Sequence, residues 1–173
     1  MKRRTMRRWI LPVILAAAAL ALPDAIGSAS PGELHEFVRG SWKAIRHAHA
    51  GRPVVVHFWG VTCGPCQVEM PRWDKLLHER ADLELVTVNA DLVPDDPGAV
   101  SNMLAETGLA GAENWMFNDG FVERLRFEID PQWQGEIPLT VLIGRDGGTT
   151  TIEGVVEPDV IRTWLDGQVQ ASK

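Results

Sequence analysis

The sequence has few residues that could form disulfides or bind metal ions through sulfur, because only two of its 173 residues are cysteine. It has no tyrosine. It has no tract of biased composition and no repeat with a period of about 20–50 residues, which excludes solenoids and other repeat architectures. Its one long uncharged apolar run lies within the first thirty residues. The remaining length suits one globular domain with a hydrophobic core and is too short for two.

The first thirty residues have the layout of an export signal. A basic front is followed by the uncharged apolar run 9–22 and then by a stretch of small residues. This order is typical of a secretory signal peptide, so we expect residues 1–29 to be removed and residues 30–173 to form the mature domain. The alternative is an uncleaved anchor, although a run of this length that includes Pro12 is short for a spanning helix, which needs about 20 residues.

Basic residues are scarce in the predicted mature domain. Without residues 1–29 the chain keeps 12 basic and 22 acidic residues, a net charge of −10. This excess of acid argues against nucleic acids and anionic membrane surfaces as partners. We therefore expect a soluble acidic domain that binds no nucleic acid.

The two cysteines, Cys63 and Cys66, stand two residues apart in the stretch VVVHFWGVTCGPCQVEMP. Export implies an oxidising compartment, but the loop between these cysteines is too short to serve as a structural staple. The pair lies where a predicted buried strand meets a predicted helix, whose N-terminus favours the thiolate, the attacking species. The pattern predicts a redox pair in which Cys63 is exposed and Cys66, one turn on, points inward and resolves a mixed disulfide.

Other uses of the cysteines are weaker hypotheses. A structural zinc site needs four Cys or His ligands, and the sequence has no second C-x-x-C and no histidine pair at zinc-finger spacing. A copper-binding chaperone that uses Cys63, Cys66 and His57 is an alternative from another class of protein. Two inert buried thiols are the remaining interpretation.

Hydrophobic patterns predict an α/β fold with four strands and five helices. The strands are expected at 53–60, 83–91, 138–147 and 149–156, and the helices at 40–51, 65–81, 96–108, 120–130 and 158–169. The early strands alternate with helices and should be parallel, whereas the last two form an antiparallel hairpin. The prediction is a mixed central sheet with helices on both faces. The apolar side of the helix at 65–81 is expected to contain Val68, Trp73, Leu76 and Leu77.

At these residues the sequence resembles the thioredoxin superfamily. FWGVTCGPC is similar to the active-site segment of that family, Pro71 matches its helix-kinking proline, and Ile137-Pro138 matches the segment that holds its cis-proline. Gly154, after the hairpin, also fits. The resemblance covers about residues 37–168 and is best within the exported TlpA/ResA-like thiol–disulfide oxidoreductases. It implies a thioredoxin-like fold with a helical insert at about 109–134.

The resemblance also implies catalytic roles for two ionisable residues. Glu69, one turn past Cys66, is expected to be either a partly buried acid that raises the thiol pKa and relays a proton, as the resemblance implies, or a solvated helix residue. His57 occupies the position of a buried aspartate in thioredoxin. It is expected either to shuttle the proton of Cys66 or to be a satisfied histidine of a buried strand.

Three further residues are predicted to contact the substrate. Trp59 is expected to provide a platform beside the cysteines as well as part of the core. By the resemblance, the backbone at Ile137, just before Pro138, pairs with an extended partner chain as an added strand. Thr62 departs from the family pattern, which usually has tryptophan before the first cysteine.

The resulting hypothesis is a periplasmic thiol–disulfide oxidoreductase, most simply a disulfide reductase, with no metal and no cofactor beyond the redox-active disulfide. By resemblance, its clients would be disulfide-bearing proteins such as apocytochrome c, in cytochrome c biogenesis, or copper-site proteins. Its electrons would come from a membrane thiol reductase. The expected form is a monomer. The same fold used as a thiol oxidase or isomerase is the alternative.

Overall fold

The computed structural model describes residues 32–91 and 96–170, so the predicted signal peptide or anchor lies outside the described residues. The strands are β1 (Leu34–Phe37), β2 (Val54–Trp59), β3 (Glu84–Asn89), β4 (Glu113–Phe117), β5 (Leu139–Ile143) and β6 (Thr149–Glu153). The helices are α1 (Ser41–Ala48), α2 (Gly64–Glu79), α3 (Pro97–Glu106), α4 (Val122–Ile129) and α5 (Pro158–Gln170), with a 3₁₀ turn, η1 (Leu109–Gly111). None of the helices in these two ranges is long and apolar enough to cross a membrane.

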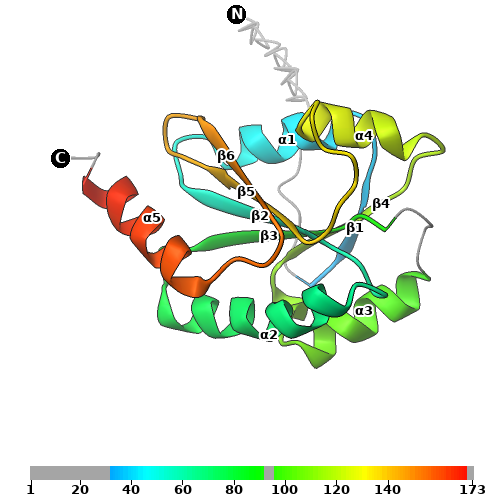
Figure 1. The fold of residues 1–173 in the computed structure, drawn as a ribbon, viewed down its shortest axis with the longest axis horizontal. Helices are drawn as coiled ribbons and strands as arrows, with labels where there is room; N and C mark the ends of the chain where they lie inside the picture. Colours follow the sequence, from blue (N-terminus) through cyan, green and yellow to red (C-terminus); the bar gives the residue numbers. More distant parts are fainter. Residues whose placement is uncertain (1–31, 92–95, 171–173) are drawn as a thin grey trace, which may run out of the picture.

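One six-stranded mixed sheet organises the molecule, in the order β1-β4-β3-β2-β5-β6 (Figure 1). The first four strands of that order are mutually parallel. β5 runs antiparallel to β2, and β6 completes an antiparallel hairpin with β5. The predicted α/β class, with parallel early strands and a C-terminal hairpin, is confirmed.

β2 lies between β3 and β5 in the interior of the sheet, and all six of its residues are buried. Its alternate side chains therefore enter two separate apolar layers. Val54, Val56 and Phe58 pack with residues of α1 and α4, whereas Val55 and Trp59 pack with residues of α2, α3 and α5. Helices thus cover both faces, as Figure 1 shows, and the end of β2 delivers the chain to the start of α2.

Two strands, β1 and β4, were not predicted, and β4 corrects the description of residues 109–134 as a helical insert. α4 lies in that segment as expected, but β4 precedes it and fills a place in the sheet between β1 and β3. β4 lacks β-branched residues and contains a buried asparagine, Asn114, so its sequence does not read as a strand. Asn114 is tolerated because it accepts a hydrogen bond from Thr87 Oγ1 (2.6 Å) and donates to Leu109 O (3.0 Å).

The expected apolar side of α2 was partly wrong. Trp73 and Leu76 are buried, but Val68 is 61% exposed. Glu69 and Met70 are buried in its place. The helix therefore turns a carboxyl group, not a valine, toward the interior one turn after the second cysteine.

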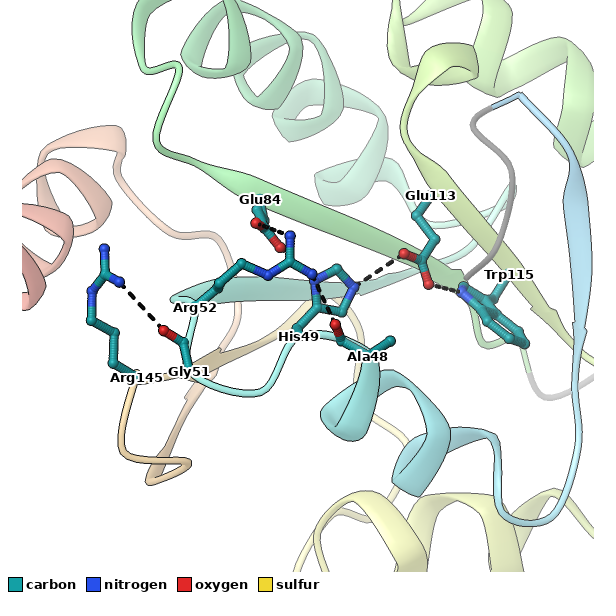
Figure 2. Close-up of polar contacts among 8 residues, drawn as sticks. All are labelled: Ala48, His49, Gly51, Arg52, Glu84, Glu113, Trp115 and Arg145. Carbon is teal, nitrogen blue, oxygen red and sulfur yellow. Dashed lines mark hydrogen bonds and ion pairs between the residues drawn. The ribbon is translucent and has the colours of Figure 1, made fainter. Parts of the chain in front are cut away.

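The C-terminal end of α1 is joined to the sheet by charged groups, shown in Figure 2. His49 Nδ1 lies 2.5 Å from Glu84 Oε2 at the start of β3, and its Nε2 lies 3.1 Å from Glu113 Oε2 at the start of β4. Trp115 Nε1 donates to Glu113 (2.8 Å), and Arg52 donates to Glu84 (2.5 Å). Burial opposes charge on His49, but the hydrogen bonds to Glu113 and Glu84 outweigh it and raise the pKa of His49 above 6.5.

Candidate active site

Cys63 and Cys66 form a disulfide at the N-terminus of α2, with an S–S distance of 2.07 Å and a Cα–Cα distance of 5.2 Å. Cys63 is the N-cap residue of the helix, and its Sγ accepts a hydrogen bond from the Cys66 backbone N–H at 3.2 Å. Cys63 is partly exposed, whereas Cys66 is completely buried. The predicted arrangement of an accessible first sulfur and an inward second one is confirmed. The same N–H group and the helix N-terminus would stabilise a thiolate on Cys63.

The peptide bond between Ile137 and Pro138 is cis, as the resemblance implied. The Ile137 carbonyl oxygen lies 3.7 Å from Cys63 Sγ, a distance at which a Cys63 thiol could donate to it. Pro138 O accepts a hydrogen bond from Gly154 N–H at 2.8 Å, which joins this segment to the end of β6. The structure therefore places the backbone of Ile137 directly beside the accessible sulfur.

Sequence reasoning missed the residues that hold the Ile137 segment in place. Arg126 of α4 is 7% exposed, and its Nη1 donates to Gln134 O at 2.9 Å. Trp133 is buried against Phe58, and its Nε1 donates to Glu136 O at 2.8 Å. Both bonds satisfy carbonyls just before Ile137. The signals available were a basic residue on an otherwise apolar helix face and a tryptophan inside a polar loop, neither of which specifies its partner.

Glu69 is buried on the Cys66 side of α2, as the resemblance implied. Its Oε1 accepts a hydrogen bond from Val156 N–H at 2.9 Å. Burial raises the pKa of Glu69 to about 7, against the opposing effects of that hydrogen bond and of Arg72. Glu69 follows Cys66 by three residues, so the two side chains share one face of the helix. A carboxyl group that titrates near neutral pH therefore stands one turn from the buried sulfur.

His57 lies in the core on β2. It is completely buried, its Nδ1 shares a hydrogen bond with Thr140 Oγ1 at 3.1 Å, and its ring lies 5.3 Å from that of Trp73. Burial lowers the pKa of His57 to about 3, so the imidazole is neutral near pH 7. Its partner is a side chain of β5, which sequence reasoning did not identify. The geometry favours the buried strand histidine over the proton shuttle.

Trp59 does not lie on a surface that a partner could touch, which corrects its predicted contact with the substrate. Its side chain is completely buried and packs in the layer that contains Cys66 and Met70. Thr62, beside Cys63, is exposed. The surface next to the accessible sulfur is therefore formed by Thr62 rather than by an indole.

Gly60 is a further residue whose role the sequence did not reveal. Its carbonyl accepts the Cys63 N–H at 3.2 Å, which fixes the approach of the chain to the disulfide. A Cβ atom at this position would lie 2.3 Å from the carboxylate of Asp91. A side chain is therefore excluded here unless Asp91 moves.

The arrangement gives no support to the copper hypothesis. Within residues 32–91 and 96–170, no three His, Cys, Asp or Glu side chains are grouped so that they could hold a metal ion. His57 in particular is already bonded to Thr140.

Part of the chain is similar to known proteins. The thioredoxin family model matches residues 36–101. The thiol–disulfide oxidoreductase ResA of Geobacillus kaustophilus is 31% identical over 102 residues, which are 51% of this chain and 56% of the relative. Residues 36–101 of this chain therefore resemble the thioredoxin family. Over the matched segment the chain is similar to ResA, and its own Cys63 and Cys66 lie at disulfide distance.

Solved structures have the same fold as this chain. A secreted disulfide oxidoreductase of Mycobacterium tuberculosis, described as homologous to DsbE of E. coli, has a TM-score of 0.55 and 23% identity, with coverage of 72% of this chain and 85% of its own. StoA from Bacillus subtilis has a TM-score of 0.51 and 21% identity, with coverage of 67% and 84%. The chain spans about half the length of the ResA relatives that it matches.

Proposed function

We propose that this protein is a periplasmic disulfide reductase that acts on exported proteins through the Cys63–Cys66 pair. The observation that supports it most directly is the partly exposed Cys63 sulfur at a helix N-terminus, 3.7 Å from the carbonyl of Ile137 and bonded to the buried Cys66. The signal-like layout of residues 1–29 and the structural neighbour described as secreted support action outside the cytoplasm. In this proposal residues 1–29 direct export and are then removed, or they remain as an anchor.

The reaction begins with the reduced protein. The Cys63 thiolate attacks one sulfur of a client disulfide, forms a mixed disulfide and releases the other client sulfur as a thiolate. Cys66 loses its proton and attacks Cys63 Sγ, which re-forms the Cys63–Cys66 disulfide and releases the second client thiolate. Two electrons pass from the protein to the client.

Glu69 is proposed to receive the Cys66 proton. Its pKa of about 7 lets it exchange a proton at neutral pH, and its place one turn beyond Cys66 brings it to the correct side of the helix. His57, whose pKa is about 3, is not proposed to carry this proton, because it is a poor base at neutral pH.

The client is proposed to bind as an extended segment across the backbone at Ile137. That backbone lies beside the accessible sulfur, so a strand paired with it would bring a client disulfide to Cys63. Apocytochrome c and copper-site proteins are the proposed clients, and a membrane thiol reductase is the proposed electron donor. Thiol oxidation or isomerisation remains the second candidate, because direction depends on the reduction potential.

The first experiment is to trap the intermediate. Cys66→Ser leaves Cys63 able to attack but removes the thiol that releases the client. We expect reduced Cys66→Ser to accumulate a mixed disulfide with a disulfide-bearing peptide, seen by mass spectrometry as a reducible adduct on Cys63. Cys63→Ser is the matched control and should form far less adduct. Equal adducts on both variants would contradict the assignment of Cys63 as nucleophile.

The second experiment decides direction. The reduction potential of the pair is measured by equilibration with dithiothreitol or glutathione buffers, followed by tryptophan fluorescence. A value at or below about −270 mV supports a reductase, because that is the range of thioredoxin. A value near about −120 mV would contradict it and favour an oxidase.

A further inference from the structure

A pocket lies away from the cysteines, between the C-terminal end of α1 and the turn that joins β5 to β6. Its volume is about 370 Å³. Its lining consists of residues 42, 43, 46, 47, 49–51 and 143–147. Trp42 and Ile143, which are 5% and 3% exposed, supply apolar surface to it. A volume of this size falls within the range of pockets for small molecules, about 300–1,000 Å³.

The pocket collects cations that have no carboxylate partner. Lys43, Arg46 and Arg145 line it, and none of them forms an ion pair with a carboxylate in the described part of the chain. Six other basic residues do so, namely Arg52, Arg72, Lys75, Arg80, Arg126 and Arg162. In a domain with 22 acidic and 12 basic residues, three unpaired cations at one pocket need a reason.

Acidic groups near the pocket offset only part of its positive charge. Asp146 also lines it and accepts the Gly148 N–H at 2.9 Å within the turn, so its carboxylate offsets one of the three positive charges. The hydrogen bond from Arg80 lowers the pKa of Asp82, and the charge of Arg145 adds to this effect without an ion pair between Arg145 and Asp82. His49 also lines the pocket, and the two carboxylates it contacts at the starts of β3 and β4 belong to the network in Figure 2.

The two arginines are held in place by the backbone. Arg46 Nη2 donates to Gly147 O at 3.0 Å, and Arg145 Nη1 donates to Gly51 O at 3.3 Å, which is drawn in Figure 2. Arg46 thus links α1 to the β5–β6 turn, and Arg145 links that turn to the loop that follows α1. Each guanidinium uses one of its five N–H donors in these bonds. The remaining donors form a fixed fork of the kind that matches a carboxylate or a phosphate.

We propose that this pocket binds a small organic anion that carries a phosphate or carboxylate group. Lys43, Arg46 and Arg145 would bind the anionic group, and Trp42 and Ile143 would contact an apolar body. The proposed ligand is a free molecule rather than a membrane headgroup, because residues 30–173 carry a net charge of −10, which disfavours contact with an extended anionic surface. The pocket lies at the Ile143 end of β5, whereas Pro138 precedes the other end, so the site is distinct from the disulfide.

The test uses glycerol 3-phosphate and citrate as probes of the two anionic groups, titrated into the oxidised protein by calorimetry at low ionic strength. Amide chemical shifts locate the binding. We expect at least one probe to bind and to shift the amides of Gly51 and Gly147. The double variant Arg46→Gln/Arg145→Gln should weaken binding about tenfold or more, because it removes two charged donors.

The matched control is Arg39→Gln/Arg124→Gln, which makes the same change in net charge at arginines that do not line the pocket and have no ion pair among the described residues. It should bind as the unchanged protein does. Lys43→Gln, an exposed change with little structural cost, tests the site if the double variant is unstable. Equal loss in the control, absence of binding by both probes, or binding only to phosphatidylglycerol vesicles would overturn the proposal. The reduction potential should be the same in all variants.

Discussion

At the scale of single residues, burial decides which ionisable groups can take part in proton transfer. Glu69 and His57 are both almost completely removed from water. The same loss of hydration moves their pKa values in opposite directions, to about 7 for the acid and about 3 for the base. Only the carboxyl group is therefore left with a pKa at which a proton can be exchanged at neutral pH.

Glu69→Gln should change how stability depends on pH. The folded pKa of about 7 lies above the unfolded value of 4.5, so the protonated acid favours folding fully below pH 4.5, and this advantage is lost as pH rises through 7. The loss amounts to about 3 kcal/mol, at about 1.4 kcal/mol for each pKa unit. We expect the unfolding free energy of Glu69→Gln, relative to the unchanged oxidised protein, to rise by that amount between pH 4 and pH 8.

Urea unfolding at a series of pH values measures this difference. Glu153→Gln, which changes an exposed carboxylate on β6, serves as the control and should show no such rise. A constant difference between Glu69→Gln and the unchanged protein across that range would show that Glu69 does not titrate there.

The pH profile of the reaction should separate Glu69 from His57. We expect the rate at which the reduced protein reacts with oxidised glutathione to show an inflection near pH 7 that disappears in Glu69→Gln. The rate at the optimum should fall by about a hundredfold, the lower range for loss of a general acid or base. His57→Asn should keep the inflection, because a histidine with a pKa of about 3 does not titrate in that range. Loss of the inflection in His57→Asn alone would assign the proton transfer to the histidine instead.

At the scale of elements, polar side chains join segments whose own sequences specify only helix or strand. Asn114 connects β4 to the turn before it, and Arg126 connects α4 to the loop that precedes Ile137. His49 connects the end of α1 to the starts of β3 and β4. Each of these polar groups needs a hydrogen-bond partner from the neighbouring segment, since an unpaired buried polar group costs about 1–3 kcal/mol.

His49→Gln should destabilise the protein more at low pH than at high pH. The folded pKa of His49 is raised, so its contribution is fully present below 6.5 and is lost as pH rises through the folded value. We expect a loss of about 2 kcal/mol near pH 6, the scale of hydrogen bonds to a charged group, and a smaller loss near pH 9. Chemical unfolding at both pH values measures it. His47→Gln, at an exposed position two residues earlier, is the control, and an equal loss at both pH values would contradict a charged His49.

At the scale of the whole molecule, the sheet separates two apolar layers and ends at β1. β1 has only four residues, yet Phe37 at its end is completely buried and lies 5.1 Å, ring to ring, from Phe117 of β4. The chain thereby covers an edge of β4 that would otherwise expose unpaired backbone groups. The packing of β1 on this edge of the sheet therefore depends on Phe37 and Phe117, which are far apart in the sequence.

Phe37→Ala should test how much the packing of β1 against β4 stabilises the protein. We expect a loss of about 3–5 kcal/mol in the unfolding free energy, as for other buried phenylalanines replaced by alanine. Phe121→Ala is the matched control, because that side chain is 59% exposed and should cost far less. Urea unfolding compares the two. Similar losses in both variants would mean that β1 contributes little to the packed core.

The sequence predicted most of the elements because their patterns are local. β2, with its run of buried residues, and the helices that follow each strand show the expected periods and breaks. β1 and β4 were not predicted, because short, partly polar strands acquire their structure from pairing with neighbouring strands. Trp59 lies in the core as expected, but it does not form a surface beside the cysteines, and Val68 is not on the buried side of α2. Both differences arise because the rotation of a helix and the depth of a strand end depend on what packs against them.

The sequence by itself determined the chemistry of this protein. Two cysteines in a C-x-x-C pattern, a strand before them and a helix after them define a thiol pair at a helix N-terminus, and these are properties of adjacent residues. Only the tertiary structure decided what surrounds that pair. The carbonyl of Ile137 beside Cys63, Val156 at Glu69, Thr140 at His57 and the cationic pocket near Arg145 all join residues distant in the chain. Burial and pKa values follow from those long-range contacts, because desolvation depends on every segment that packs against a group.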